Sequence, residues 1–122
     1  MKTTANFLLI LLAVVLIWGC KSDEILSDNN TQEINLKSGQ IYIYDFNISG
    51  DEEGATIIAP PEHAEISEIV RDATTNWSVV YKYQPVAGYK GIDSVEIETC
   101  TGGDGTNCGQ SKLYLLQFNI SD

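Results

Sequence analysis

Three cysteines and one histidine are the side chains in this 122-residue chain with the most distinctive chemistry. Cys100 and Cys108 enclose the glycine-rich segment TGGDGTN, whereas Cys20 stands at the end of an apolar run. The spacing of Cys100 and Cys108 does not fit a CxxC redox motif. A metal site needs several converging ligands, and His63 is the chain's one histidine. The cysteines therefore predict a disulfide and one separate thiol, and we expect no metal site.

Cys20 follows a segment with the pattern of a secretion signal. Met1 and Lys2 give a positive start, and residues 7–18 (FLLILLAVVLIW) are apolar throughout. This run is shorter than the roughly 20 apolar residues of a membrane span and fits the hydrophobic region of a signal peptide. Gly19 is small enough for cleavage beside it, and the thiol that follows could then carry a diacylglyceryl group. We therefore expect residues 1–19 to be a signal peptide and Cys20 to be the lipid attachment point.

The residues around Cys20 also carry a family resemblance. Residues 17–20 resemble the lipobox of bacterial lipoproteins, although Trp18 stands where that family has a small or medium residue. Lys21, Asp23 and Glu24 resemble the export signal of Bacteroidota surface lipoproteins. The resemblance implies a lipid anchor in the outer membrane with the protein at the cell surface. The alternatives are a periplasm-facing anchor, an uncleaved membrane anchor, or an ordinary secretion signal with an unrelated cysteine.

In an exported protein, Cys100 and Cys108 are best explained as a disulfide across a hairpin. Closing so short a loop would stabilise the fold by about 2 to 3 kcal/mol. The enclosed glycines make this loop costly to order, so the bridge would restrain it. Restraint also lowers the entropic cost of binding, so the loop has two possible uses, stabilisation and binding. It does not match a phosphate-binding loop, because no lysine accompanies the glycines.

The sequence gives little support for catalysis. A nucleophile, a base and oxyanion donors must converge, and His63 lies in a proline-containing turn far from any such set. Glu96 and Glu98 fall on the polar face of an alternating segment, and residues 51–53 fall in a turn. We expect a non-enzyme without a cofactor. Calcium bound by acidic loops is a minor alternative, since those loops lack the regular acid spacing of a calcium site.

The charge of the chain limits its partners. All 17 acidic residues follow Cys20, whereas one of the seven basic residues, Lys2, precedes it. Nucleic acid needs clustered lysine and arginine, and the sequence contains no such cluster. We therefore expect no nucleic-acid partner. The remaining candidates are the membrane, through the lipid anchor, and a protein or glycan ligand.

The chain after Cys20 divides into a tether and one domain. Residues 20–33 are mostly polar and predict a flexible tether, and residues 34–122 alternate with a period of two. Strands are expected at 33–36, 41–49, 55–58, 64–70, 77–84, 95–99 and 113–120. The pattern places Trp77 with Val79, Tyr81 and Tyr83 on an inward face. Most aromatic residues alternate inward in this way, so core packing is favoured over a glycan-stacking platform. About seven strands predict an all-β antiparallel sandwich.

Two segments within the domain resemble a known family. Residues 59–67 (APPEHAEIS) and 81–100 resemble the bacterial Ig-like and cadherin-like domains of surface and adhesive proteins. The motif of the second segment consists of Pro85, Gly88, Tyr89, Gly91 and Asp93. Proline presets a turn, glycine permits positive φ, and aspartate can cap loop amides, so we interpret this motif as structural.

Together these observations predict a surface-anchored lipoprotein with one non-catalytic Ig-like domain. Its expected role is adhesion, ligand binding or interaction within the cell envelope. The alternative is an acidic inhibitor of a basic host or competitor enzyme, with the bridged loop as its contact.

Overall fold

The computed structural model describes residues 30–122, which form seven strands and one short 3₁₀ turn. The strands are β1 (Asn30–Lys37), β2 (Tyr42–Asp45), β3 (Gly54–Ala59), β4 (Ala64–Val70), β5 (Val80–Pro85), β6 (Gly91–Thr101) and β7 (Gln110–Ser121). The turn η1 (Ala73–Thr75) lies between β4 and β5. All seven expected strands are present, with boundaries that differ by a few residues.

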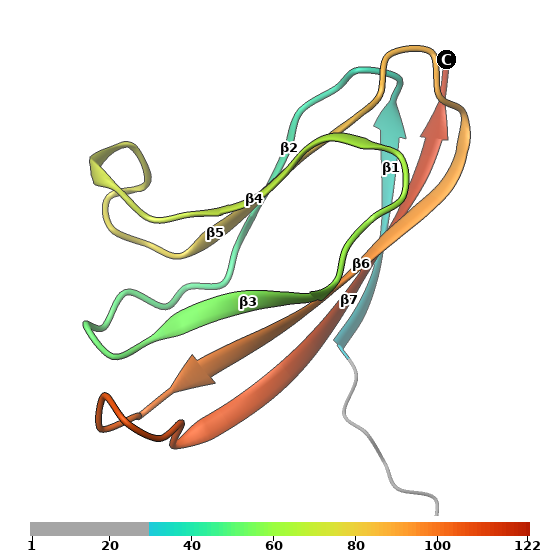
Figure 1. The fold of residues 1–122 in the computed structure, drawn as a ribbon. Helices are drawn as coiled ribbons and strands as arrows, with labels where there is room; N and C mark the ends of the chain where they lie inside the picture. Colours follow the sequence, from blue (N-terminus) through green and yellow to red (C-terminus); the bar gives the residue numbers. More distant parts are fainter. Residues whose placement is uncertain (1–29) are drawn as a thin grey trace, which may run out of the picture.

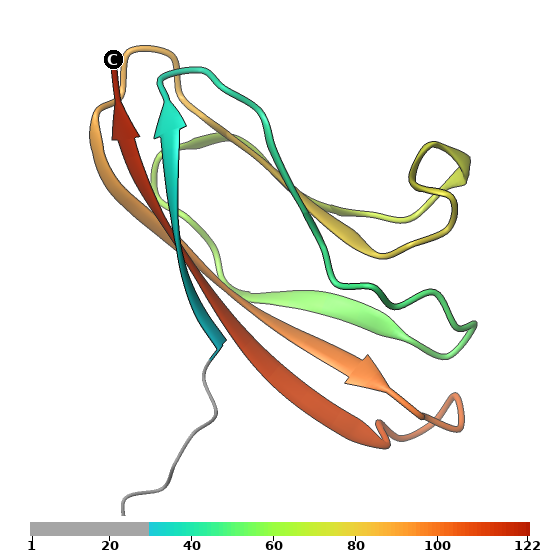
Figure 2. The ribbon, with the colours of Figure 1, turned by 180° about the vertical axis from the view of Figure 1, so that it is seen from behind.

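The strands form two sheets that face each other (Figures 1 and 2). The first has the order β1-β7-β6-β3, and the second has the order β2-β5-β4. Strands that follow one another along the chain often change sheet, as β2 and β3 do. The predicted all-β sandwich is confirmed.

Side chains of alternating residues fill the space between the sheets. The most completely buried of them are Tyr81, Tyr83, Phe118, Ile97, Leu116, Val79 and Val95. At the centre, the rings of Tyr83 and Phe118 stack with their centroids 3.9 Å apart. The rings of Tyr42 and Phe118 pack edge to face, with their centroids 5.7 Å apart. Each aromatic ring removes a large apolar area from water, so the inward row that joins Tyr81 to Tyr83 is core, as expected.

Two expectations about the first strand need correction. β1 begins at Asn30, so residues 30–33, which we assigned to the tether, belong to the domain. β1 also pairs with β7 in parallel, in a sandwich whose other pairs are antiparallel. The reason is the order of the turns: β2 is antiparallel to β5 and so begins at the end where β5 finishes, which is also the end where β6 begins and β7 finishes. Because a short turn joins β1 to β2, β1 finishes at that end as well and runs in the same direction as β7. In this orientation Ile34 and Leu36 still face the core.

The expected position of Trp77 is also wrong. Trp77 does not join the inward row, because β5 begins three residues later, at Val80. Its φ angle is +64°, which turns the backbone out of the extended conformation, and 59% of the residue is exposed. Trp77 therefore belongs to the loop before β5, where it points away from the core.

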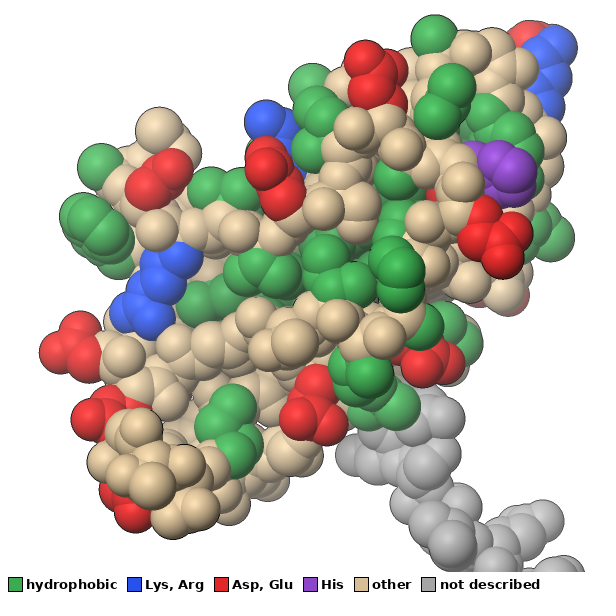
Figure 3. All heavy atoms as spheres, viewed as in Figure 1, with side chains coloured by type: hydrophobic (Ala, Val, Ile, Leu, Met, Phe, Trp, Pro, Cys, Tyr) green, Lys and Arg blue, Asp and Glu red, His purple; other side chains and the backbone are tan. Residues whose placement is uncertain are grey.

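Apolar side chains also reach the surface along one side of the sandwich. Figure 3 shows a hydrophobic band between the two sheets, on the side where β3 and β4 form the edges.

Residues 30–122 contain no helix that is long and apolar enough to cross a membrane.

Candidate binding surface

The predicted turn motif is organised around the buried carboxylate of Asp93. The residue is 5% exposed and accepts hydrogen bonds from four donors. These are the backbone N–H groups of Glu62, His63 and Ser94, at 2.9, 3.1 and 3.0 Å, and the Tyr83 hydroxyl, at 2.8 Å. Asp93 thereby joins β6, β5 and the turn between β3 and β4. The expectation that it caps loop amides agrees with this geometry.

The phenols near Asp93 are shifted by their surroundings. Burial, and next the hydrogen bond to Asp93, raise the pKa of the Tyr83 hydroxyl far above its ordinary value. Burial also raises the pKa of Tyr81 to about 12, although a hydrogen bond with Ser67 acts in the opposite direction. Both phenols therefore stay protonated in the folded protein at neutral pH.

The remaining motif residues build the turn between β5 and β6. Pro85 ends β5 as a buried residue, and Gly88 and Gly91 have φ angles of +85° and +134°. The Tyr89 hydroxyl donates to the Ile92 carbonyl at 2.8 Å, and its ring stacks on His63 at 3.9 Å. A side chain at position 91 would lie 3.0 Å from the Tyr89 oxygen, which explains the glycine there. These contacts are those of a structural motif.

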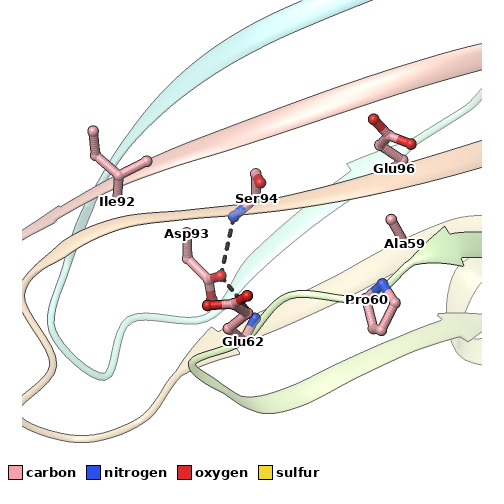
Figure 4. Close-up of a pocket in the computed structure, with 7 residues that line it drawn as sticks. All are labelled: Ala59, Pro60, Glu62, Ile92, Asp93, Ser94 and Glu96. Atoms are coloured by element: carbon pink, nitrogen blue, oxygen red, sulfur yellow. Dashed lines mark hydrogen bonds between the residues drawn. The ribbon is translucent and has the colours of Figure 1, made fainter.

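A hollow of about 380 Å³ lies beside Asp93, where β3 leaves β6 (Figure 4). Figure 4 shows Ile92, Ser94 and Glu96 on one side of β6, with Asp93 and Glu62 on the other. The Asp93 oxygens already accept hydrogen bonds from the four donors described above. Asp93 therefore has little capacity left to bind a ligand in this hollow. It is therefore a weaker candidate for ligand binding than the opposite end of the molecule.

At that opposite end, three loops finish the sandwich: residues 46–53 lie between residues 71–79 and residues 102–109 (Figure 1). We refer to their combined surface as the three-loop face. The loops connect β2 to β3, β4 to β5 and β6 to β7, and both ribbon views show them at the end away from the C-terminus. In β-sandwiches, loops grouped at one end of a rigid scaffold are common binding sites.

Arg71 joins two of these loops. Its guanidinium donates to the backbone carbonyls of Ser49, Gly50 and Glu53, at distances of 2.7, 2.8 and 2.9 Å. The Ser78 hydroxyl adds a bond to the Asp45 carboxylate at 2.5 Å. Loops 46–53 and 71–79 therefore form one hydrogen-bonded unit.

The loop that carries Trp77 is also ordered from within. Asp72 caps η1, accepting from the Thr74 N–H, while the Thr75 hydroxyl pairs with the backbone of Asp72. The Trp77 N–H donates to the Asp72 carbonyl at 2.9 Å. Asn76 and Trp77 are both left-handed, with φ angles of +52° and +64°. Consecutive left-handed residues other than glycine are uncommon, and a bulky one such as tryptophan is an outlier.

The third loop is closed by the predicted disulfide, which is confirmed. The sulfurs of Cys100 and Cys108 are bonded, with their Cα atoms 5.6 Å apart. Inside the loop, the Asp104 carboxylate accepts from the N–H groups of Thr106 and Asn107 at 2.9 and 2.7 Å. Loop 46–53 packs against it, since a side chain at Gly105 would come within 3.2 Å of the Glu52 carboxylate. Glu52 and the bridged loop enclose a hollow of about 220 Å³.

The three-loop face is acidic. Its loops contain Asp51, Glu52, Glu53, Asp72 and Asp104, and their one basic residue is Arg71. The Arg71 guanidinium is held in place by three backbone carbonyls, and acidic residues outnumber it on these loops. Acidic side chains are visible on these loops in Figure 3. Hydrogen bonds from Thr74 lower the pKa of Asp72, and those from the Asn107 and Thr106 amides lower that of Asp104.

Several predicted sites are not tested by this geometry. Cys20, Lys21, Asp23 and Glu24 lie outside the described residues. Among residues 30–122, no three histidine, cysteine, aspartate or glutamate side chains are grouped so that they could hold a metal ion.

Sequence reasoning missed the roles of Trp77, Arg71 and Glu52. The segment DATTNW carries a usable signal, because Asp72 followed by Thr75 is a capping pattern and Asn76 tolerates a left-handed backbone. That signal would have placed the start of the next strand after Trp77. The contacts of Arg71 and Glu52 join loops far apart in the sequence, which no local pattern indicates.

No protein-family model and no curated protein matches this chain. Among solved structures, it is similar to an endo-fucoidan hydrolase of glycoside hydrolase family 107, with a TM-score of 0.47 and 17% identity. That similarity covers 80% of this chain and 14% of the hydrolase. The chain is also similar to a cysteine protease inhibitor from Entamoeba histolytica, with a TM-score of 0.44 and 11% identity, over 75% of this chain and 92% of the inhibitor. Neither similarity assigns an activity to this chain.

Proposed function

We propose that this protein is a cell-surface lipoprotein whose non-catalytic Ig-like domain binds a partner through the three-loop face. The observation that carries the proposal is the ordered state of that face. Arg71 and the disulfide fix loops that end a rigid sandwich, and they leave the large side chain of Trp77 exposed. A preordered surface with an exposed aromatic residue loses little entropy when it binds.

The grouping of strands supports an Ig-like assignment. In the Ig fold, the second, fifth and fourth strands share one sheet, and the third, sixth and seventh share the other. The present sheets contain the same two groups, with β1 added beside β7. Tyr89, in the turn before β6, donates its hydroxyl to a nearby backbone carbonyl, as the tyrosine of an Ig tyrosine corner does. Here, however, the carbonyl belongs to Ile92 and lies downstream.

The anchoring part of the proposal rests on residues 1–24. A signal-like run that ends in Gly19-Cys20 supports lipidation, and Lys21, Asp23 and Glu24 support export to the outer face. In a Cys20→Ala variant we expect the protein to lose its lipid and leave the membrane fraction, or to remain unprocessed. If this variant is still processed and membrane-bound, the lipid anchor is refuted.

Surface display has a separate test. Replacing Lys21, Asp23 and Glu24 with alanine should abolish antibody labelling of intact cells while the total amount of protein persists. Labelling of permeabilised cells is the control, since it reports the protein on either face. Undiminished labelling of intact cells would show that these residues do not direct export.

The binding role can be tested by placing a photo-crosslinking amino acid in the three-loop face. Thr106 is a suitable position, because its side chain is exposed at the tip of the bridged loop. Ala87, exposed in the turn between β5 and β6, is the matched control. We expect illumination of intact cells to give a discrete adduct from position 106 that excess unlabelled protein suppresses. Equal adducts from both positions, or none from position 106, would refute binding through this face.

A second candidate function is inhibition of a basic enzyme. The hollow between Glu52 and the bridged loop favours it, because that loop projects from the end of the β6–β7 hairpin beside an acidic group. Inhibition would require the intact loop, so reduction of the Cys100–Cys108 bond should weaken it. A crosslinked partner that has no enzymatic activity would exclude this candidate.

A further inference from the structure

We infer that the three-loop face binds a lysine- or arginine-rich protein surface, with a cationic side chain of the partner stacked on the Trp77 indole. This inference rests on the proposed binding function and specifies the chemistry of the partner. Three features of the described residues support it: the presentation of Trp77, the rigidity of the surface around it, and the sign of the surrounding charge.

Trp77 is presented to solvent by its own backbone. A single exposed apolar residue is ordinary on protein surfaces. Trp77 differs because the φ angles of both Asn76 and Trp77 are positive, which directs the side chain outward. The bonds from the Trp77 and Ser78 N–H groups to the carbonyls of Asp72 and Thr75 fix the backbone on both sides. The indole is therefore displayed on a short, ordered loop.

The support beneath Trp77 is continuous across the three loops. Arg71 connects loop 71–79 to loop 46–53, and Glu52 of the second loop packs against Gly105 of the third. The disulfide then closes the third loop. A partner that contacts Trp77 therefore meets loops that are already ordered, with Asp72 on the same loop and the other carboxylates on the two loops connected to it.

The charge of the face selects among partner classes. A cation over an indole ring is attracted to the ring face, and nearby carboxylates add to that attraction. Five carboxylates and one guanidinium lie in these loops, which leaves the face with a net formal charge of −4. An acidic glycan or nucleic acid would be repelled by this surface. A neutral glycan could stack on Trp77 but would make no use of the charges, so a cationic protein fits the surface best.

The test uses the full-length chain in detergent micelles and an oligo-arginine peptide as the probe. A Trp18→Phe background makes Trp77 the one fluorescent indole even in chains from which residues 1–19 have not been removed. We expect the peptide to change the Trp77 emission and its affinity to fall several-fold as salt rises from about 50 to 200 mM. Two kinds of variant are needed, one that removes the indole and one that removes carboxylates of the surrounding loops. Variants without Trp77 are compared with the parent by calorimetry, because they have lost the fluorophore.

Trp77→Ala should weaken peptide binding roughly tenfold, and Trp77→Phe should weaken it less, since phenylalanine retains part of the cation–π attraction. Ile92→Ala is the matched control, because Ile92 is equally apolar and 63% exposed but lies near the other end of the sandwich. Asp51→Asn combined with Glu52→Gln should lower both the affinity and its salt dependence. Glu65→Gln, on β4 and outside the three loops, is the control for charge.

Two outcomes would overturn the inference. One is equal peptide affinity for the parent and the Trp77→Ala variant, which would reduce the interaction to unspecific attraction by an acidic protein. The other is tighter, salt-independent binding of a neutral oligosaccharide such as cellohexaose at Trp77, which would make the face a glycan platform. In either case, a specific adduct from position 106 would still support the proposed binding function, so the two failures can be told apart.

Discussion

Asp93 is a carboxylate whose hydrogen-bonding capacity the fold uses for its own backbone. Its four donors come from β5, β6 and the turn after β3, so one side chain fixes three segments. The sequence motif predicted that Asp93 caps loop amides, and three of its four donors are backbone N–H groups. It could not indicate Tyr83 as the fourth donor, because that contact depends on how β5 and β6 lie across the core.

Replacing Asp93 with alanine should therefore destabilise the domain by at least about 3 kcal/mol, since several buried donors would lose their acceptor. Tyr83→Phe should cost about 1 to 2 kcal/mol, because Asp93 then keeps its three backbone donors. Urea unfolding followed by circular dichroism measures both values. Glu96→Ala, also on β6, serves as the control, and a loss for Asp93→Ala no larger than the control would contradict this account.

Trp77 leads to the opposite expectation for stability. A left-handed conformation costs a residue other than glycine about 1 to 2 kcal/mol, and glycine is largely free of that cost. We expect Trp77→Gly to leave the domain as stable as the parent or stabilise it by up to about 1 kcal/mol. Val79→Gly, at a buried position two residues later, should destabilise it strongly. A large loss of stability for Trp77→Gly would show that Trp77 serves the fold rather than a partner.

At the scale of elements, the strands follow from alternation and the loops do not. The period of two in residues 113–120 places Tyr114, Leu116, Phe118 and Ile120 on one face, and the last three are buried while Tyr114 is partly buried. The same reasoning extended β5 three residues too far towards the N-terminus and so included Trp77. Alternation alone does not mark where a strand begins. The parallel pairing of β1 depends on which sheet β2 joins, and that choice is made by contacts distant in sequence.

The disulfide is the element-scale feature with the most direct test. Cys100→Ser should lower the stability of the domain by about 2.5 kcal/mol, because the unfolded chain regains the freedom of the closed loop. The fold should persist at room temperature, since the bridge lies at the end of the β6–β7 hairpin and outside the core. Thermal melts with and without reductant provide the measurement. Identical melting temperatures in the two conditions would contradict a stabilising bridge.

At the scale of the whole molecule, the sandwich could be predicted from sequence, but the three-loop face could not. Strand periodicity and turn residues are local properties, and they determine the number of strands. The face depends on which loops end at the same edge, which follows from the order of strands in two sheets. Only that order brings Arg71 to Ser49 and Glu52 to Gly105.

The buried phenols lead to a prediction about the stability of the whole fold at alkaline pH. Burial raises the pKa of Tyr81 from 10.0 to about 12, so the folded state holds this proton where the unfolded chain releases it. The associated stability is complete below pH 10 and is lost as the pH rises towards 12. Denaturant unfolding measured from about pH 9 to 12 should show constant stability at the start of the series and falling stability above pH 10. Tyr81→Phe should flatten the fall, and an unchanged slope would assign it to other groups.

The parallel ladder between β1 and β7 has a mechanical consequence. Any tension that reaches the domain through the residues before Asn30 enters at the first residue of β1. β1 is paired with β7 from Asn30 to Lys37, so the component of that tension along the strand loads the whole ladder in shear. Bonds loaded in shear resist together, whereas bonds that are peeled apart break one after another. The entry strand is therefore placed to bear load, because the hydrogen bonds along the whole β1–β7 ladder share the tension that enters at Asn30.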